Sequence, residues 1–90
     1  MTKISRTVTI TNRRGLHARA SAKFVTLAST QPVEVAVVKD GSPVTGTSIM
    51  GLMMLGAAMG DIITISAQGD GAEAAVNALA ELVEAKFGEE

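Results

Sequence analysis

The chain lacks cysteine, tyrosine and tryptophan, and its 90 residues include two phenylalanines and one histidine. Without cysteine there is neither a disulfide framework nor a thiolate metal site, which suits a reducing cytoplasm. One histidine argues equally against a histidine-based metal site. The missing tyrosine and tryptophan remove the stacking platform that nucleic-acid-binding proteins commonly use. We therefore expect a cytoplasmic protein with no metal, no cofactor and no nucleic-acid partner.

Long apolar runs are also missing. The uncharged stretch 41–60 is apolar only over residues 49–59, where Gly51 and Gly56 interrupt it, so it falls well short of the roughly 20 residues that a transmembrane helix needs. The first six residues carry charge but no apolar segment, so we expect no signal peptide and no membrane association. Ninety residues bury roughly 60% of their unfolded surface, which predicts one small domain over residues 1–90, and we expect it to be a monomer.

Charge is divided unevenly along the chain. Residues 1–33 contain six basic residues and no acidic one, whereas residues 34–90 contain two basic and nine acidic residues. The overall pI of about 5.8 is not that of a typical nucleic-acid-binding domain. The basic N-terminal third should instead attract phosphoryl groups or acidic protein surfaces.

Alternating apolar and polar residues predict two long strands, residues 4–11 and 61–68, each with one polar face. Valines at alternate positions of residues 33–37 indicate a shorter strand. Asp40-Gly41 is a strong hairpin signal, and Pro43 in the return segment predicts a short edge strand.

Apolar residues at helical spacing predict two long helices, residues 16–28 and 71–87. Asp70 and Glu73 resemble a capping box at the start of the second one. With a short helix between the last two strands, the polar strand faces predict a two-layer α+β sandwich, in which three helices cover one face of a four-stranded antiparallel sheet. A ferredoxin-like fold begins with the same βαββαβ order, so the pattern alone leaves both topologies open.

Residues 12–20 join a basic turn to the start of a helix that carries the only histidine. Gly15 permits a tight turn, Leu16 can contact the first helical turn, and His17 then lies at or beside the N-cap. Unpaired backbone N–H groups at this end attract anions such as phosphate and disfavour a protonated ring, so we expect a neutral, nucleophilic His17. Arg19 could screen the charge of a phosphoryl group. A surface or capping histidine without chemistry would fit the same position.

The motif Gly15-Leu16-His17-Ala18-Arg19, followed by an alanine-rich helix, resembles the phosphorylation site of the HPr phosphocarrier family. The resemblance extends over essentially the whole chain and favours the HPr-like topology. It implies that His17 accepts a phosphoryl group from the phosphoenolpyruvate-dependent Enzyme I and passes it to a IIA-type acceptor, with Arg19 assisting. Such a protein is a carrier in a transferase relay and not an enzyme. Many members have proline after the arginine, where this chain has Ala20.

A second family-like segment, Ser48-Ile49-Met50-Gly51, begins the predicted short helix, which Thr47 or Ser48 can cap. In many family members a dedicated HPr kinase/phosphorylase phosphorylates the matching serine. The methionines could fill core gaps, but so short a helix cannot bury every side of an apolar segment. The resemblance favours a docking surface for partner proteins, and its candidate residues are Leu16, Ala20, Thr47, Ile49, Met50, Leu52 and Met53.

Two other functions fit part of the sequence. An HPr-fold regulatory protein could act through phosphorylation of Ser48, although the retained His17 argues against that as its sole role. A ferredoxin-like domain could bind a ligand or nucleic acid. Within the carrier role, Ala20 and the Ser48 motif favour a nitrogen-related regulatory branch over a sugar-uptake branch.

Overall fold

The structure is a computed structural model that describes residues 2–89. Met1 and Glu90, the two ends of the predicted domain, lie outside the described residues. The strands are β1 (Lys3–Thr9), β2 (Ala36–Lys39), β3 (Ser42–Thr45) and β4 (Ile62–Gln68). The helices are α1 (Ala18–Ala28), α2 (Ile49–Met54) and α3 (Ala72–Glu84), followed by a 3-10 turn, η1 (Lys86–Gly88).

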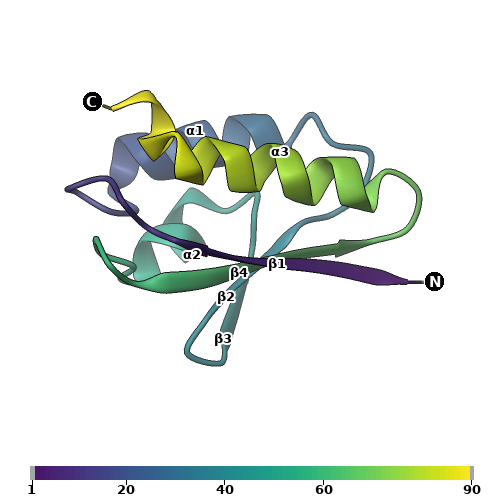
Figure 1. Cartoon of the computed structure of the whole chain (residues 1–90), viewed down its shortest axis with the longest axis horizontal. Helices are drawn as coiled ribbons and strands as arrows, with labels where there is room; N and C mark the ends of the chain where they lie inside the picture. The colour runs from purple at the N-terminus through teal and green to yellow at the C-terminus, as the bar shows by residue number, and fades with distance from the viewer. Residues whose placement is uncertain (1, 90) are drawn as a thin grey trace.

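The four strands form one antiparallel sheet in the order β1-β4-β2-β3. Helices α1 and α3 pack against each other over one face of this sheet, and α2 packs beside α1 and β3 (Figure 1). The predicted α+β sandwich is therefore confirmed. Within residues 2–89, none of the helices has the length and apolar character that crossing a bilayer requires.

The hydrophobic core lies between the sheet and the helices. In β4, Ile63 and Ile65 point into it and are fully buried, while Thr64 between them points to the other face. Phe24 of α1 and Leu79 of α3 are fully buried in the same core. The predicted first strand ends two residues early, at Thr9, although Ile10 stays buried and its N–H still donates to the Asp61 carbonyl at 2.8 Å.

The predicted hairpin is confirmed. Asp40 and Gly41 both have positive φ, +51° and +80°, the conformation of a tight two-residue turn. The turn joins β2 to β3, where Lys39 pairs with Ser42. Pro43 lies on β3, which is an edge strand as predicted, so its missing N–H does not interrupt the sheet.

The predicted capping box is wrong. The N-cap of α3 is Gly71 in a left-handed conformation, with φ +89°, and no side chain caps the helix there. A Cβ at this position would lie 2.7 Å from Cγ of Pro32, so both the backbone conformation and the close approach require glycine. Glu73 does lie in the first turn, where a negative charge favours the helix.

The predicted end of the last helix, at Phe87, is also wrong. Helix α3 ends at Glu84, and Lys86 and Phe87 then adopt positive φ values of +59° and +56°. Phe87 is nevertheless 1% exposed, because the turn folds its ring back into the core. The same turn carries Glu89 towards the start of α1, as the two contacts of its carboxylate show.

Candidate functional site

Gly15 sets the entry to helix α1. Its φ is +63°, and a Cβ there would lie 2.3 Å from the carbonyl oxygen of Ala57. The next residue, Leu16, donates its backbone N–H to that same oxygen at 2.9 Å. Only glycine allows the turn to lie this close to the loop after α2. Helix α1 begins three residues after Gly15, at Ala18, and His17 is the residue immediately before it.

His17 is the N-cap of α1, as predicted. Its carbonyl accepts the N–H of Ser21 at 2.9 Å, and its ring nitrogen Nδ1 accepts the backbone N–H of Arg19 at 3.3 Å. The other ring nitrogen, Nε2, lies 2.5 Å from Oε2 of Glu89. The side chain is 14% exposed, so the ring is held between the helix start and the C-terminal segment.

Glu89 completes the surroundings of the ring. Its second oxygen, Oε1, accepts a hydrogen bond from Nδ2 of Asn12 at 3.1 Å, and the same amide donates to the Gly15 carbonyl at 2.9 Å. The hydrogen bond from His17, and then that from Asn12, hold the pKa of Glu89 below its ordinary value of 4.5, while desolvation acts in the opposite direction. Glu89 is therefore a carboxylate near neutral pH.

Neither Asn12 nor Glu89 is among the site residues predicted from the sequence. Asn12 lies within the histidine stretch, and its buried position between Gly15 and Glu89 gives it a structural role there. Nothing in the local pattern around Glu89 indicates its position, because that depends on the left-handed turn at Lys86 and Phe87.

A basic cleft of about 380 Å³ adjoins the histidine. Its lining residues are Thr11, Asn12, Arg13, Arg14, Arg19, Lys86 and Glu89. Four cationic side chains and one carboxylate thus line the cleft, and the carboxylate contacts His17. Three of the four cations come from the basic N-terminal third, and such a cleft attracts anions to the ring. Among the described residues, no group of three or more His, Cys, Asp and Glu side chains could hold a metal ion.

A family model described as PTS HPr component phosphorylation site matches residues 4–85. The chain belongs to the HPr phosphocarrier family. Phosphocarrier protein NPr of Shewanella violacea is 45% identical over 89 residues, which are 99% of this chain and 98% of the relative. Phosphocarrier protein HPr of Neisseria meningitidis serogroup A is 46% identical over 86 residues, 96% of this chain and 97% of the relative.

A solved HPr structure has the same fold. The crystal structure of HPr-C-His from Thermoanaerobacter tengcongensis is 46% identical, and the two superpose with a TM-score of 0.89 over 100% of this chain and 99% of the other. These matches decide for the HPr-like topology and against the ferredoxin-like one. HPr proteins are phosphocarriers of the phosphotransferase system, which is the general role of this family.

The second segment of this HPr-family chain forms an exposed apolar surface on α2. Ser48 is its N-cap, and Oγ accepts the N–H of Gly51 at 2.9 Å. Thr47, Ile49, Met50 and Met53 are exposed, as a docking surface requires. Met54, Met59 and Ile62 are further exposed apolar side chains, which are not among the predicted docking residues.

Three predicted docking residues are buried. Leu16 and Ala20 lie in the core beneath the start of α1, and Leu52 is 0% exposed on the inner side of α2. The prediction of these three as partner contacts is therefore wrong. They belong to the hydrophobic core, and a side chain buried in the core cannot also contact a partner.

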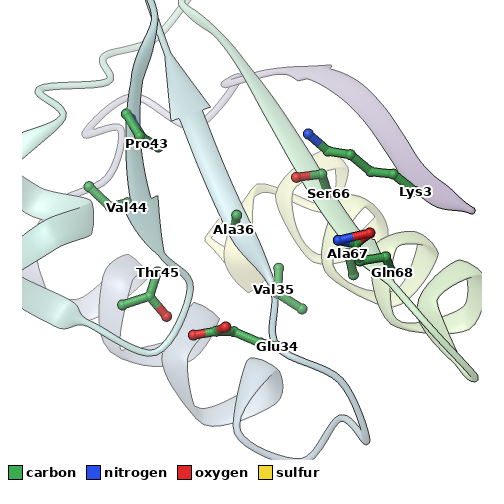
Figure 2. A pocket seen from close by; sticks show the side chains of 10 residues that line it. All are labelled: Lys3, Glu34, Val35, Ala36, Pro43, Val44, Thr45, Ser66, Ala67 and Gln68. Atoms are coloured by element: carbon green, nitrogen blue, oxygen red, sulfur yellow. The ribbon is translucent and has the colours of Figure 1, made fainter. Parts of the chain in front are cut away.

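A larger hollow of about 620 Å³ lies away from the histidine, on the sheet (Figure 2). Strands β2, β3 and β4 carry most of the residues that line it, including Ala36, Thr45 and Ser66. None of the predicted site residues lines this hollow. The candidate site of this HPr-family protein therefore stays at His17 and the basic cleft.

Proposed function

We propose that this HPr-family protein carries a phosphoryl group on His17 in the cytoplasm. It accepts the group from Enzyme I, which phosphoenolpyruvate charges, and passes it to a IIA-type acceptor. The observation that supports this most is the position of the only histidine: it caps α1 directly beside a cleft lined by four cations. A histidine with a merely structural role would not need these neighbours.

In the transfer, Nδ1 of His17 attacks the phosphorus atom in line with the donor. A phosphorus–nitrogen bond forms, the bond to the donor breaks, and its electron pair leaves with the donor. The start of α1 stabilises the bound group by about 0.3–1 kcal/mol. Modest stabilisation suits a carrier, since each additional 1.4 kcal/mol of stability in the phosphorylated state slows release roughly tenfold. The protein returns unchanged after each cycle and is not itself an enzyme.

Arg19 screens the charge of the phosphoryl group. It is exposed, lines the basic cleft, and its backbone N–H contacts Nδ1 of the ring. A guanidinium there stabilises the metaphosphate-like group as it passes between the donor and Nδ1 of His17. Its neighbours Arg13 and Arg14 extend the positive field over the approach of an acidic partner.

The docking surface for Enzyme I and the acceptor is made of Thr47, just before α2, and the exposed α2 residues Ile49, Met50 and Met53. Unbranched methionine side chains adapt to differently shaped partners. The loop after α2 reaches the histidine turn through the hydrogen bond from Leu16 to Ala57. A monomer of this protein thus offers its apolar surface and its phosphoryl site to one partner together.

Ser48 regulates this docking when an HPr kinase/phosphorylase phosphorylates it. A phosphate on Oγ places about two negative charges beside exposed Ile49 and Met50 and opposes burial of that surface. The kinase should label the wild type but not Ser48→Ala, and labelled protein should accept phosphate at His17 more slowly. Equal labelling of both proteins would contradict the assignment and remove Ser48 from the proposal.

The test of the carrier role is phosphoryl uptake from phosphoenolpyruvate with purified Enzyme I. Wild type should acquire one phosphoryl group, and His17→Ala should acquire none while keeping its circular dichroism spectrum. Two Enzyme I preparations, one sugar-type and one nitrogen-type, separate the branches, and Ala20 leads us to expect faster uptake from the nitrogen-type enzyme. Uptake from neither would contradict the carrier role and favour a regulatory protein acting through Ser48.

A further inference from the structure

The two contacts of the His17 ring assign one protonation pattern. A backbone N–H can only donate, so Nδ1, which lies 3.3 Å from the N–H of Arg19, accepts and holds its lone pair. An ionised carboxylate can only accept, so Nε2, beside Oε2 of Glu89, carries the ring proton. Both contacts thus point independently to the Nε2-protonated tautomer.

We propose that Glu89 is a positioning residue for phosphoryl transfer: its carboxylate binds the Nε2 proton of His17 and leaves the Nδ1 lone pair, at the start of α1, as the nucleophile. This inference rests on the proposed function of His17. It names a residue that the histidine motif does not contain and that lies 72 positions away along the chain.

The C-terminal segment holds the carboxylate of Glu89 in place. The buried ring of Phe87 anchors the segment in the core, and Nζ of Lys23 donates to the Phe87 carbonyl at 2.7 Å. The N–H of Glu89 donates to the Lys86 carbonyl at 2.9 Å. Asn12 then binds Oε1 of Glu89, so that Oε2 remains directed at the ring. Because these contacts fix the Glu89 carboxylate, it restricts the orientation of the His17 ring more than a mobile side chain would.

The proton balance of the transfer follows from this arrangement. When the phosphorus–Nδ1 bond forms and the donor leaves with the electron pair of the broken bond, the Nε2 proton stays on the ring. The ring becomes positively charged, and the adjacent carboxylate compensates that charge. When an acceptor takes the phosphoryl group, the bond electrons return to Nδ1 and the ring is neutral again. No proton has to be exchanged with water in either direction.

The carboxylate does not cancel the attraction of the site for phosphate. Glu89 contacts Nε2, whereas the phosphoryl group binds Nδ1 on a different corner of the ring. The cleft that Glu89 lines also contains Arg13, Arg14, Arg19 and Lys86. One negative charge among four positive ones leaves the field favourable to anions.

The tautomer can be measured directly, because the chain contains a single histidine. Long-range nitrogen–proton NMR spectra of uniformly ¹⁵N-labelled protein, taken where the ring is neutral, report which nitrogen is protonated. Wild type should be mainly Nε2-protonated, and Glu89→Ala should show a several-fold larger share of the Nδ1-protonated form. Glu89→Gln keeps an acceptor oxygen and should lie between the two.

Glu81→Gln, which changes an exposed residue on α3, should match wild type. A wild-type ring protonated mainly on Nδ1, or equal populations in wild type and Glu89→Ala, would overturn the proposal.

Rates of uptake from charged Enzyme I provide the second readout. Glu89→Ala should accept phosphate roughly tenfold more slowly, which corresponds to about 1.4 kcal/mol of transition-state stabilisation, and Glu89→Gln should recover part of the rate. Uptake at the wild-type rate or faster in Glu89→Ala would overturn the positioning role. The NMR measurement needs no donor, so the tautomer result stands apart from the carrier role. A wild type that takes up no phosphate contradicts the proposed function and not the assigned tautomer.

Discussion

The backbone N–H of Leu16 donates to the carbonyl of Ala57 at 2.9 Å, and this bond joins the histidine turn to the loop that follows α2. The bond is possible because Gly15, immediately before, has no Cβ to meet the same carbonyl. The proposed phosphoryl acceptor and the proposed docking surface are therefore connected by a close backbone contact. Its geometry makes Gly15 a sensitive position, although glycine itself performs no chemistry.

Gly15→Ala should destabilise the protein by roughly 1–3 kcal/mol, because it combines an unfavourable positive φ with a clash against Ala57. Urea unfolding measures the loss. Gly56→Ala is the matched control, since Gly56 has nearly the same φ, +65° against +63°, but has nothing within 4 Å of the added Cβ. An equal loss in both variants would show that the close approach to Ala57 contributes nothing.

Phe87→Ala should cost about 3–5 kcal/mol of unfolding free energy, the usual cost of removing a fully buried aromatic ring. It should also release Glu89 from His17, which the tautomer measurement would detect. If the last helix instead continued past Glu84 with an exposed ring at position 87, the cost would be about 0.5 kcal/mol or less. That small value would contradict the turn at Lys86 and Phe87.

The stability supplied by Glu89 should depend on pH. The hydrogen bond from His17, followed by that from Asn12 and by the charge of Lys23, lowers the pKa of Glu89 in the folded protein below 4.5. A lowered carboxyl pKa stabilises the fold above the unfolded-state value, and this contribution is lost as the pH falls through the folded-state pKa. Wild type should thus be more stable than Glu89→Gln at neutral pH, and the difference should shrink as the pH falls below 4.5 and disappear once the pH is below the folded-state pKa. Unfolding curves at several pH values measure it, and a difference independent of pH would contradict the ionised contact.

Substitutions of Met50 and Leu52, two nearby residues of α2, should distinguish an effect on partner binding from an effect on stability. Met50 is 68% exposed and Leu52 is 0% exposed. Met50→Ala should change stability by less than about 0.5 kcal/mol and weaken binding to Enzyme I about tenfold, as for an anchor residue at an interface. Leu52→Ala should instead cost about 2–5 kcal/mol of stability. Calorimetric titration with Enzyme I tests the first variant, and unchanged binding would remove Met50 from the docking surface.

Much of the fold follows from local pattern. The alternation of β4, the Asp40-Gly41 turn and the N-cap position of His17 were all predicted correctly, because each depends on residues that are neighbours in sequence. The prediction of a capping box was wrong because Gly71 is the N-cap, in a left-handed conformation. That conformation goes with its close approach to Pro32, which is distant in sequence and cannot be seen in the local pattern.

The site was only partly predictable for the same reason. The motif identifies His17 and Arg19, but the contact to Glu89 spans most of the chain and follows a turn with two positive φ values at non-glycine residues, which local propensity disfavours. The resemblance predicts a docking segment but does not indicate which of its side chains face outward. Leu16, Ala20 and Leu52 were selected together with exposed neighbours, although they face the core.

The most direct test of the carrier role is a discharge experiment on isolated phosphorylated protein. Wild type charged by Enzyme I and phosphoenolpyruvate is separated from the enzyme and mixed with a IIA-type acceptor, and phosphate on both proteins is followed in time. We expect an acid-labile, base-stable phosphoryl group on Nδ1 of His17 that transfers quantitatively to the acceptor. A group that resides elsewhere, or that remains on His17 until water removes it, would contradict the account.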